Sequence, residues 1–483
     1  MITQSGKTAN TKITNTTWAQ LKVGDTASVE RACAQRDLLL FAHVSGNLNP
    51  LMLPTEEDKA RTSNEPIAPS MWIGSLISAV LGNILPGPGT LYRSQSFEFA
   101  KRVHVGDRLR VTVTCREKRE EPVALFETIV TNATGATVCK GLAVVEAPRL
   151  QVEIEARHLP TLILEENEQF PHLVALAAQL PRLKTVVVCP ENHASLNGPL
   201  LAFEKGLIEP IFIGDPLRIA AAAKELNADL SAFRVVEEKN HRRAADKAVA
   251  MVRAGEAGAV MKGDLHSDDL LAAVVKKDGG LRTSRRISHV FVIDTPTLAD
   301  LLFVSDAAIN IAPDLMTKVD IVQNAIDLAL ACGAAPRVGV LSAVEVINPA
   351  IPSTLDAAIL SKMAERGQIR GGVVDGPLAM DNAIDIEAAR TKGIASLVAG
   401  RANVLIAPNL ESGNMLAKEL TFISHAEAAG LVVGASAPVM LTSRADNDNA
   451  RLVSCALAQL YKYWQDNGKA FTGADSEDER AAD

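Results

Sequence analysis

The chain has 483 residues, of which 47% are hydrophobic, 22% are charged and 4% are aromatic, and its formal net charge is −8. One hydrophobic core does not extend over such a length, so we expect two or three domains. The acidic balance argues against a general nucleic-acid-binding protein, whereas a local basic pocket for a phosphorylated ligand is compatible with it.

Neither a leader nor a membrane span is predicted. The first 18 residues are polar and lack the apolar stretch of a signal peptide. The longest apolar run, residues 71–85, is too short to cross a bilayer. The six cysteines are far apart and have no histidine at ligand spacing, which favours reduced thiols and no metal site. We therefore expect a cytoplasmic protein that binds neither membranes nor nucleic acids.

The first 150 residues predict a small α+β domain. The apolar run 71–85 is typical of a buried helix, and residues 111–115 and 124–130 alternate as in the strands of an antiparallel sheet. Residues 138–146 predict a further strand. The pattern thus predicts one long helix together with strands of an antiparallel sheet.

The rest of the chain predicts an α/β domain. Residues 148–168 carry scattered charge, and we interpret them as a linker or a bridging strand. From residue 169 onward short apolar strands alternate with alanine-rich helices, which favours βαβ units and parallel sheets. The predicted strands are 185–189, 208–215, 257–263, 289–294, 307–313, 337–343, 371–376, 403–408 and 438–443. The expected organisation is a disordered segment (1–17), the α+β domain (18–147), the linker (148–168), a two-lobed α/β domain (169–465) and a disordered acidic tail (466–483).

A motif in the first domain resembles the signature of the MaoC-like, R-specific enoyl-CoA hydratases. The segment 41–54 reads FAHVSGNLNPLMLP, and it has the Ser-Gly and Asn-Pro pairs of that signature. The resemblance implies a hotdog fold. It places Asn47 where the family has its catalytic Asp and Met52 where it has its catalytic His. Neither an amide nor a thioether takes up a proton at neutral pH, so we expect a degenerate hydratase site.

The region from about residue 170 to 465 resembles the phosphate acetyltransferase and phosphate butyryltransferase family. Seven collinear motifs carry the resemblance: GLIEPIFIGDP, AVMKGDLHSDDLL, GLRTSRRISHVFVID, DAAINIAPDL, DGPLAMDNAI, IAPNLESGNMLAKEL and VMLTSRAD. Their order and spacing are those of the butyryltransferase-like branch. The resemblance implies a two-lobed α/β phosphate acyltransferase domain that moves an acyl group between CoA and inorganic phosphate.

This chemistry explains the residue types that stand in the motifs. Phosphate is a weak, doubly charged nucleophile that needs cationic, bidentate donors, and the oxyanion formed at the thioester carbonyl needs fixed donors. The resemblance assigns carbonyl and phosphate contacts to Ser443 and Arg444, a pair that also occurs elsewhere as a helix cap and a surface charge. Arg282 and Thr283 form a second candidate phosphate site, beside two arginines that we expect to be solvated.

The remaining candidates are a base and a set of strand-end residues. The acetyltransferase branch has a candidate base at the position of Ala450, so we take Asp446 as the candidate here. The backbone N–H groups that follow Lys262 would face an anion if the strand there leads directly into a helix. Other candidate substrate contacts, each equally compatible with turn structure, are Asn310, Asn409, Gly413 and Asn414.

We therefore expect a phosphate acyltransferase that acts on short acyl groups, uses CoA and acyl-CoA as substrates without a further cofactor or metal, and forms a homodimer or larger homo-oligomer. Two alternatives stay open at this point. One is a fully bifunctional enoyl-CoA hydratase/phosphate acetyltransferase, which is how fusions of this kind are usually described. The other is a non-catalytic acyl-CoA sensor.

Overall fold

The computed structural model describes residues 12–53, 66–155, 169–441 and 447–473. The chain divides into two compact units, Met1–Leu162 and Ile163–Asp483. Within the described residues, no helix combines the length and the apolar character that a membrane crossing requires. All six cysteines are described, and none forms a disulfide.

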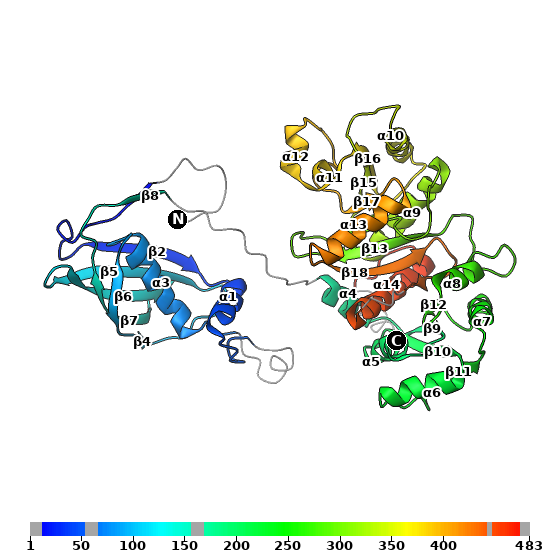
Figure 1. The fold of residues 1–483 in the computed structure, drawn as a ribbon, viewed down its shortest axis with the longest axis horizontal. Helices are drawn as coiled ribbons and strands as arrows, with labels where there is room; N and C mark the ends of the chain where they lie inside the picture. Colours follow the sequence, from blue (N-terminus) through cyan, green and yellow to red (C-terminus); the bar gives the residue numbers. More distant parts are fainter. Residues whose placement is uncertain (1–11, 54–65, 156–168, 442–446, 474–483) are drawn as a thin grey trace, which may run out of the picture. The chain divides into compact units, whose positions relative to one another are not determined.

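The N-terminal unit consists of one long helix and an antiparallel sheet (Figure 1). Its helices are α1 (Gln35–Ser45) and α3 (Ser70–Asn83). Its strands are β1 (Lys12–Thr14), β2 (Thr26–Ala32), β3 (Leu91–Gln95), β4 (Glu98–Phe99), β5 (Arg108–Lys118), β6 (Val123–Asn132), β7 (Thr137–Glu146) and β8 (Glu153–Glu155). The main sheet has the order β2-β5-β6-β7-β3, and β4 pairs with β7.

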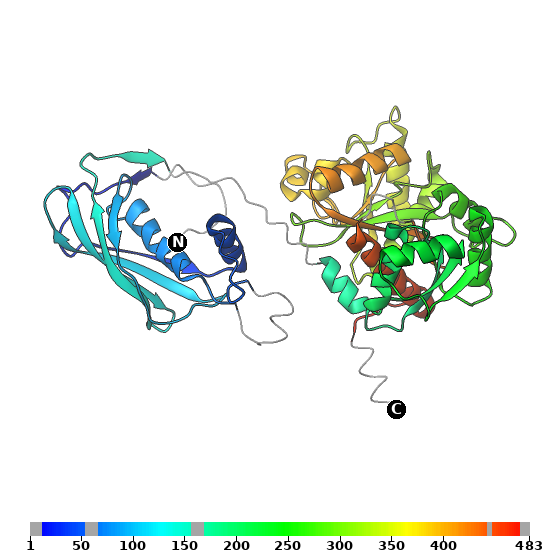
Figure 2. The same cartoon turned by 60° about the horizontal axis from the view of Figure 1, so that its bottom comes forward.

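Burial explains why these residues fold in this way. In α3 the residues Ile73, Ile77 and Val80 recur on one face and are buried. In β5 alternate residues from Leu109 to Cys115 are buried, so one face of the sheet is apolar. The helix packs against that face (Figure 2). This arrangement confirms the predicted hotdog fold.

The N-terminal segment is ordered earlier than predicted. Strand β1 pairs with β8, and the side chain of Asn15 is buried. Its Nδ2 donates to the carbonyl oxygens of Pro88 and Leu150, each at 3.0 Å, and its Oδ1 accepts from the Val152 N–H at 2.9 Å. The prediction of disorder up to residue 17 is therefore wrong for residues 12–17, because one polar side chain satisfies three backbone groups there.

The C-terminal unit is an α/β domain with a continuous sheet of the order β11-β10-β9-β12-β19-β18-β13-β14-β17-β15-β16. The strands are β9 (Leu183–Val188), β10 (Ile208–Gly214), β11 (Arg234–Glu237), β12 (Ala259–Lys262), β13 (Ser288–Asp294), β14 (Leu302–Ser305), β15 (Arg337–Leu341), β16 (Val373–Leu378), β17 (Val404–Ile406), β18 (Glu427–Val433) and β19 (Val439–Met440). The helices are α4 (Gln169–Ala177), α5 (His193–Glu204), α6 (Pro216–Glu225), α7 (His241–Arg253), α8 (Ser267–Val274), α9 (Leu315–Ala331), α10 (Pro352–Glu365), α11 (Met380–Ile384), α12 (Ile386–Thr391), α13 (Leu410–Phe422) and α14 (Asp448–Asn467).

The sheet is largely parallel, as predicted. One half runs from β11 to β19 and the other from β14 to β16, and the strands within each half are parallel. Two strands between the halves, β18 and β13, add antiparallel pairs. The two halves therefore share one sheet.

Two predictions about this domain need correction. Residues 307–313 form no strand, because β14 ends at Ser305 and the chain then turns around the Asp306 carboxylate. The ordered domain also extends past residue 465. Helix α14 continues to Asn467, and Phe471 is buried with its ring edge-on to Tyr463.

Candidate functional site

The loop after α1 brings the two altered signature positions together. Gly46 ends the helix with φ 68°, a left-handed conformation that favours glycine. The Asn47 Nδ2 then lies 3.3 Å from the Met52 Sδ. Asn49 shapes the loop between them, since its N–H donates to the Asn47 Oδ1 at 3.3 Å and its Oδ1 accepts from the Leu51 N–H at 3.0 Å.

This contact fixes what the loop can do chemically. An amide donates and accepts hydrogen bonds but has no basic lone pair at neutral pH, and a thioether is a weak acceptor. The Asn47–Met52 pair thus occupies the place where the signature has an acid–base pair, and it offers no group that takes a proton from water.

In the C-terminal unit, the arginine-rich segment between α8 and β13 lines a cleft of about 460 Å³. Arg282, Arg285 and Arg286 contribute to its wall. Asn310, which follows β14 in the sequence, also lines this cleft. The face of α8 that carries Asp268 and Leu271 also lines it. The structure therefore brings Arg282 and Asn310, two predicted site residues, to one cavity.

The members of this segment have different roles. Arg285 forms an ion pair with the buried Asp327 at 2.5 Å, and burial raises the pKa of that carboxyl while Arg285 lowers it. Thr283 donates from Oγ1 to the Gly434 carbonyl at 2.7 Å and accepts from the Arg285 N–H at 3.1 Å. Within the described residues, Arg282 and Arg286 form no ion pair. These two guanidinium groups are therefore the ones available to an anion.

Asn310 belongs to a tight turn after β14. The Asp306 side chain is buried, and its Oδ1 accepts from the Ala308 N–H at 3.0 Å and from the Ile309 N–H at 3.2 Å. Asn310 donates to the Asp306 Oδ2 from its N–H at 3.0 Å and from Nδ2 at 2.6 Å. Its Nδ2 also donates to the Ile287 carbonyl at 2.9 Å, which ties the turn to the arginine segment. Asn310 thus positions the wall of the cleft.

The segment 409–414 supports the same turn from another side. Asn409 is the N-cap of α13, since its side chain accepts from the Ser412 N–H at 3.0 Å. A Cβ at Gly413 would lie 2.5 Å from the Asp306 carbonyl oxygen, so only glycine fits there. Asn414 donates from Nδ2 to the Ala307 carbonyl at 3.1 Å. The Asn409 cap, Gly413 and the Asn414 amide together fix the position of α13 relative to the turn 306–310.

The expectation for Lys262 is corrected in part. The N–H groups that follow it are not available to an anion, because Gly263 donates to the Val188 carbonyl at 2.8 Å and Asp264 donates to the Cys189 carbonyl at 2.6 Å. A Cβ at Gly263 would lie 2.4 Å from the Val188 oxygen. The chain after β12 therefore continues its pairing with the end of β9. The Lys262 side chain is buried, and Nζ lies 3.3 Å from the Gly263 oxygen.

Ser443, Arg444 and Asp446 lie outside the described residues, but the residues that flank them line a cavity. Leu441 and Asn447 line a hollow of about 390 Å³ together with Asn414. Ala450, the position where the acetyltransferase branch has a candidate base, also lines it.

A buried histidine in this cavity was missed from the sequence. His289 stands within the apolar strand β13, and burial lowers its pKa to about 4 despite the opposing effect of Asp306. Its Nδ1 has no hydrogen-bond partner within the described residues. The only sequence signal was a histidine at the start of the HVFVID strand, which equally fits a core position.

One group of three potential metal ligands occurs within the described residues. Atoms of Cys189, Glu191 and His241 lie within 4.8 Å of one another. Glu191 is already paired with Arg218 at 2.5 Å and lies 3.3 Å from the His241 Nε2. The guanidinium group neutralises the carboxylate, so this cluster is satisfied without a metal ion.

Comparison with protein-family models gives two matches. Residues 239–459 match the phosphate acetyl/butaryl transferase family, and residues 11–136 match the MaoC like domain.

Known proteins give consistent matches to the C-terminal part. A phosphate acetyltransferase from Rhizobium meliloti is 54% identical over 297 residues, which cover 61% of this chain and 94% of that protein. A phosphate butyryltransferase from Clostridium acetobutylicum is 45% identical over 278 residues, or 57% of this chain and 92% of that protein. The crystal structure of a branched-chain phosphotransacylase from Enterococcus faecalis V583 is 28% identical, with a TM-score of 0.51 over 58% of this chain and 99% of that one.

Proposed function

The chain belongs to the phosphate acetyl/butyryl transferase family, and on this premise we propose that its C-terminal unit moves a short acyl group between CoA and inorganic phosphate. A phosphate oxygen attacks the thioester carbonyl carbon, the C–S bond breaks, and CoA leaves as the thiolate. The products are an acyl phosphate and CoA. CoA and acyl-CoA are substrates here, and we propose no further cofactor.

The observation that carries the proposal is a pair of arginines at one cleft that form no ion pair with any residue the structure describes. Arg282 and Arg286 line a cavity of about 460 Å³, whereas the neighbouring Arg285 is neutralised by Asp327. Two guanidinium groups that lack carboxylate partners hold a phosphate dianion better than ammonium groups do, because each offers a planar pair of donors. The division of roles among the arginines at positions 282, 285 and 286 thus supports a phosphate site.

We assign the reaction at the carbonyl to the segment after β19. Ser443 and Arg444 are proposed to hold the carbonyl oxygen and the phosphate, and Asp446 is proposed as the base that assists the reverse reaction by deprotonating the CoA thiol. In support, the flanking residues Leu441 and Asn447 line a cavity that also contains Asn414. Apolar side chains such as Phe170 and Phe291 contribute to its wall, as expected for a place that receives a short acyl chain.

The strand-end residues are proposed to position the site. Asn310 and Asn414 each donate to the turn 306–310, so removing either amide would shift that turn relative to Arg286. Asn409 is proposed to position the start of α13 as its N-cap. Thr283 is proposed to hold the arginine segment in place through its hydrogen bond to the Gly434 carbonyl. Lys262 is proposed to contribute charge near the end of β12.

The experiment that tests the site compares arginine variants of the full-length protein. Arg282→Ala and Arg444→Ala should each lower turnover by about 10²- to 10³-fold, the usual scale for one transition-state charge contact. Replacement by Lys should restore only part of the rate, because a point charge lacks the forked geometry. Arg285→Ala is the matched control, and it should mainly lower stability because it leaves Asp327 buried and unpaired. Near-full activity of both alanine variants would place the phosphate site elsewhere.

For the N-terminal unit we propose a hydratase-like domain that has lost hydration activity. Its match to the MaoC like domain favours binding of an acyl-CoA, and the Asn47–Met52 contact removes the acid–base pair. The fully bifunctional alternative would need a base at another position of this unit. The sensor alternative is disfavoured by the arginines that lack partners at the cleft of the C-terminal unit.

A further inference from the structure

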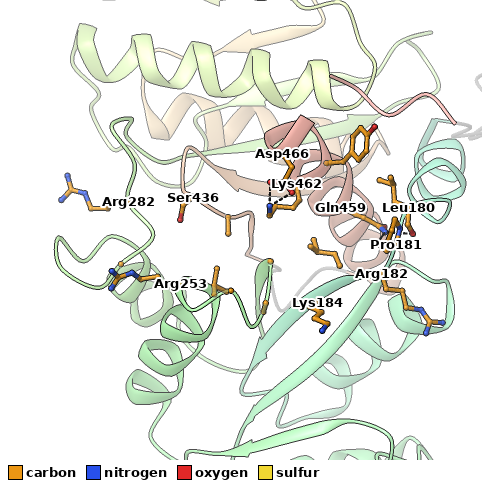
Figure 3. Close-up of a pocket in the computed structure, with 18 of the residues that line it drawn as sticks. Leu180, Pro181, Arg182, Lys184, Arg253, Arg282, Ser436, Gln459, Lys462 and Asp466 are labelled. Carbon is orange, nitrogen blue, oxygen red and sulfur yellow. Dashed lines mark hydrogen bonds and ion pairs between the residues drawn. The ribbon is translucent and has the colours of Figure 1, made fainter. Parts of the chain in front are cut away.

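A second, larger cleft lies at the amino-terminal ends of three neighbouring strands. It measures about 840 Å³ and is lined by residues that precede or begin β9, β12 and β19, among them Lys184, Gly258 and Ala437 (Figure 3). The Ser443–Arg444 segment follows the carboxyl end of β19. The cleft is therefore at the other end of that strand from the proposed reaction centre.

The lining of this cleft is strongly basic. Its charged side chains are Arg182, Lys184, Arg253, Lys277, Arg282, Lys462 and Asp466. Figure 3 shows Arg253 and Arg282 on one side of the hollow and Arg182 and Lys184 on the other, with Lys462 between them and paired with Asp466. One acidic side chain thus faces six basic ones, in a chain whose net charge is −8.

Most of this positive charge is not compensated within the protein. In the described part of the chain, Lys184, Arg253 and Lys277 form no ion pair, and neither does Arg282. The Arg182 guanidinium instead lies over the Phe203 ring, 4.2 Å from its centroid. Like charges gathered around one cavity repel one another, and an anion in the cavity removes that cost.

A glycine turn gives the cleft an open backbone wall. Gly279 has φ +91°, and a Cβ at Gly280 would lie 2.4 Å from the Lys276 carbonyl oxygen, so the turn requires both glycines. The turn brings Lys277 and Arg282 to the same cavity. Gly279 and Gly280 both line the cavity at this turn.

We propose that this cleft binds a diphosphate-bearing anion. Four of its basic side chains form no ion pair in the described part of the chain, which is enough charge for two phosphate groups. Arg253 and Arg282 lie on the same side of it, and each guanidinium group is a forked donor that suits phosphate oxygens. Arg282 lines both clefts.

Calorimetric titration of the full-length protein with pyrophosphate, at about 0.1 M salt, tests this proposal. The double variant Arg253→Ala/Lys277→Ala should bind pyrophosphate at least tenfold more weakly than the unmodified chain. Its KM values for acyl-CoA and phosphate should stay within about twofold, since neither residue belongs to the proposed reaction site. The matched control is Lys205→Ala/Lys224→Ala, which removes the same charge from exposed positions that do not line the cleft, and it should leave the affinity unchanged.

Two further titrations define the ligand. Orthophosphate should bind this site at least tenfold more weakly than pyrophosphate, because it offers one phosphate group. Titration with ADP distinguishes a nucleotide from the free diphosphate, and tight binding of either supports the diphosphate class. An unchanged pyrophosphate affinity in the double variant would overturn the proposal. So would an acyl-CoA KM that rises in parallel with the pyrophosphate Kd, because the cleft would then belong to the substrate site.

Discussion

At position 47 an amide stands 3.3 Å from the Met52 sulfur, and this one contact determines the expected chemistry of the N-terminal unit. The loop geometry around it is intact, since Gly46 caps α1 and Asn49 closes the turn. Within its described residues, 46–53, the loop has no side chain that accepts a proton.

The first prediction follows from this residue pair. The unmodified protein should hydrate crotonyl-CoA at a rate indistinguishable from the uncatalysed background, while Asn47→Asp/Met52→His should give measurable hydration. The change supplies a carboxylate and an imidazole at adjacent positions, and a spectrophotometric assay of the enoyl thioester follows it. Met52→His alone is the control and should stay inactive. Robust hydration by the unmodified chain would contradict the account and point to another base.

The arginine segment shows how far single residues could be predicted. The resemblance of the motifs placed Arg282 at a phosphate site, and the structure puts it at a cleft with Asn310. The motifs did not predict that Arg285 forms an ion pair. Its partner, Asp327, is 42 residues away in the sequence and contacts Arg285 only in the folded chain.

At the scale of elements, the strands with strong apolar alternation were predicted and the others were not. Strand β18 reads EAAGLVV, and its alanines and glycine give little sign of a strand, because its stability comes from pairing with β13 and β19. The apolar run around β14 was assigned to residues 307–313, since the turn around Asp306 depends on hydrogen bonds that no local pattern encodes.

The second prediction concerns the buried histidine of β13. Burial lowers the pKa of His289 to about 4 in the folded protein, while the unfolded chain takes up the proton near the ordinary value of 6.5. Between these values the unfolded state binds more protons, so this group makes the free energy of unfolding fall as the pH falls from 6.5 toward 4. The midpoint temperature of thermal unfolding, measured by calorimetry, should therefore fall less between about pH 7 and about pH 5 in His289→Gln than in the unmodified protein.

The control for this prediction is His172→Gln, because His172 is exposed at the start of the same unit. That variant should keep the pH dependence of the unmodified protein. An identical pH dependence in the His289→Gln variant would show that the histidine is not a source of acid lability.

The whole molecule combines a hotdog unit and an α/β unit in one chain, and both were predictable because the first carries the signature 41–54 and the second carries seven collinear motifs. The boundaries were less predictable. Residues 12–17 and Phe471 are fixed by single side chains, Asn15 and Tyr463, whose partners lie elsewhere in the fold.

The third prediction concerns assembly. Among the described strands, β3 pairs with β7 alone and so forms an edge of the N-terminal sheet, and it exposes Leu91 with 64% of its surface accessible. Leu142 and Phe99 are also exposed on neighbouring strands. An apolar edge of this kind favours pairing with a second copy, so light scattering at micromolar concentration should give a homodimer or a larger homo-oligomer. Leu91→Lys should shift the distribution toward smaller species, and a monomeric unmodified protein would contradict the prediction.

The most direct measurement for the central claim is the release of CoA thiol from acetyl-CoA and butyryl-CoA by the purified full-length protein, with and without inorganic phosphate. If phosphate is the nucleophile, CoA release should require it, and an equal amount of acyl phosphate should form. Release at the same rate without phosphate would show that water is the nucleophile, and the protein would then be a thioesterase.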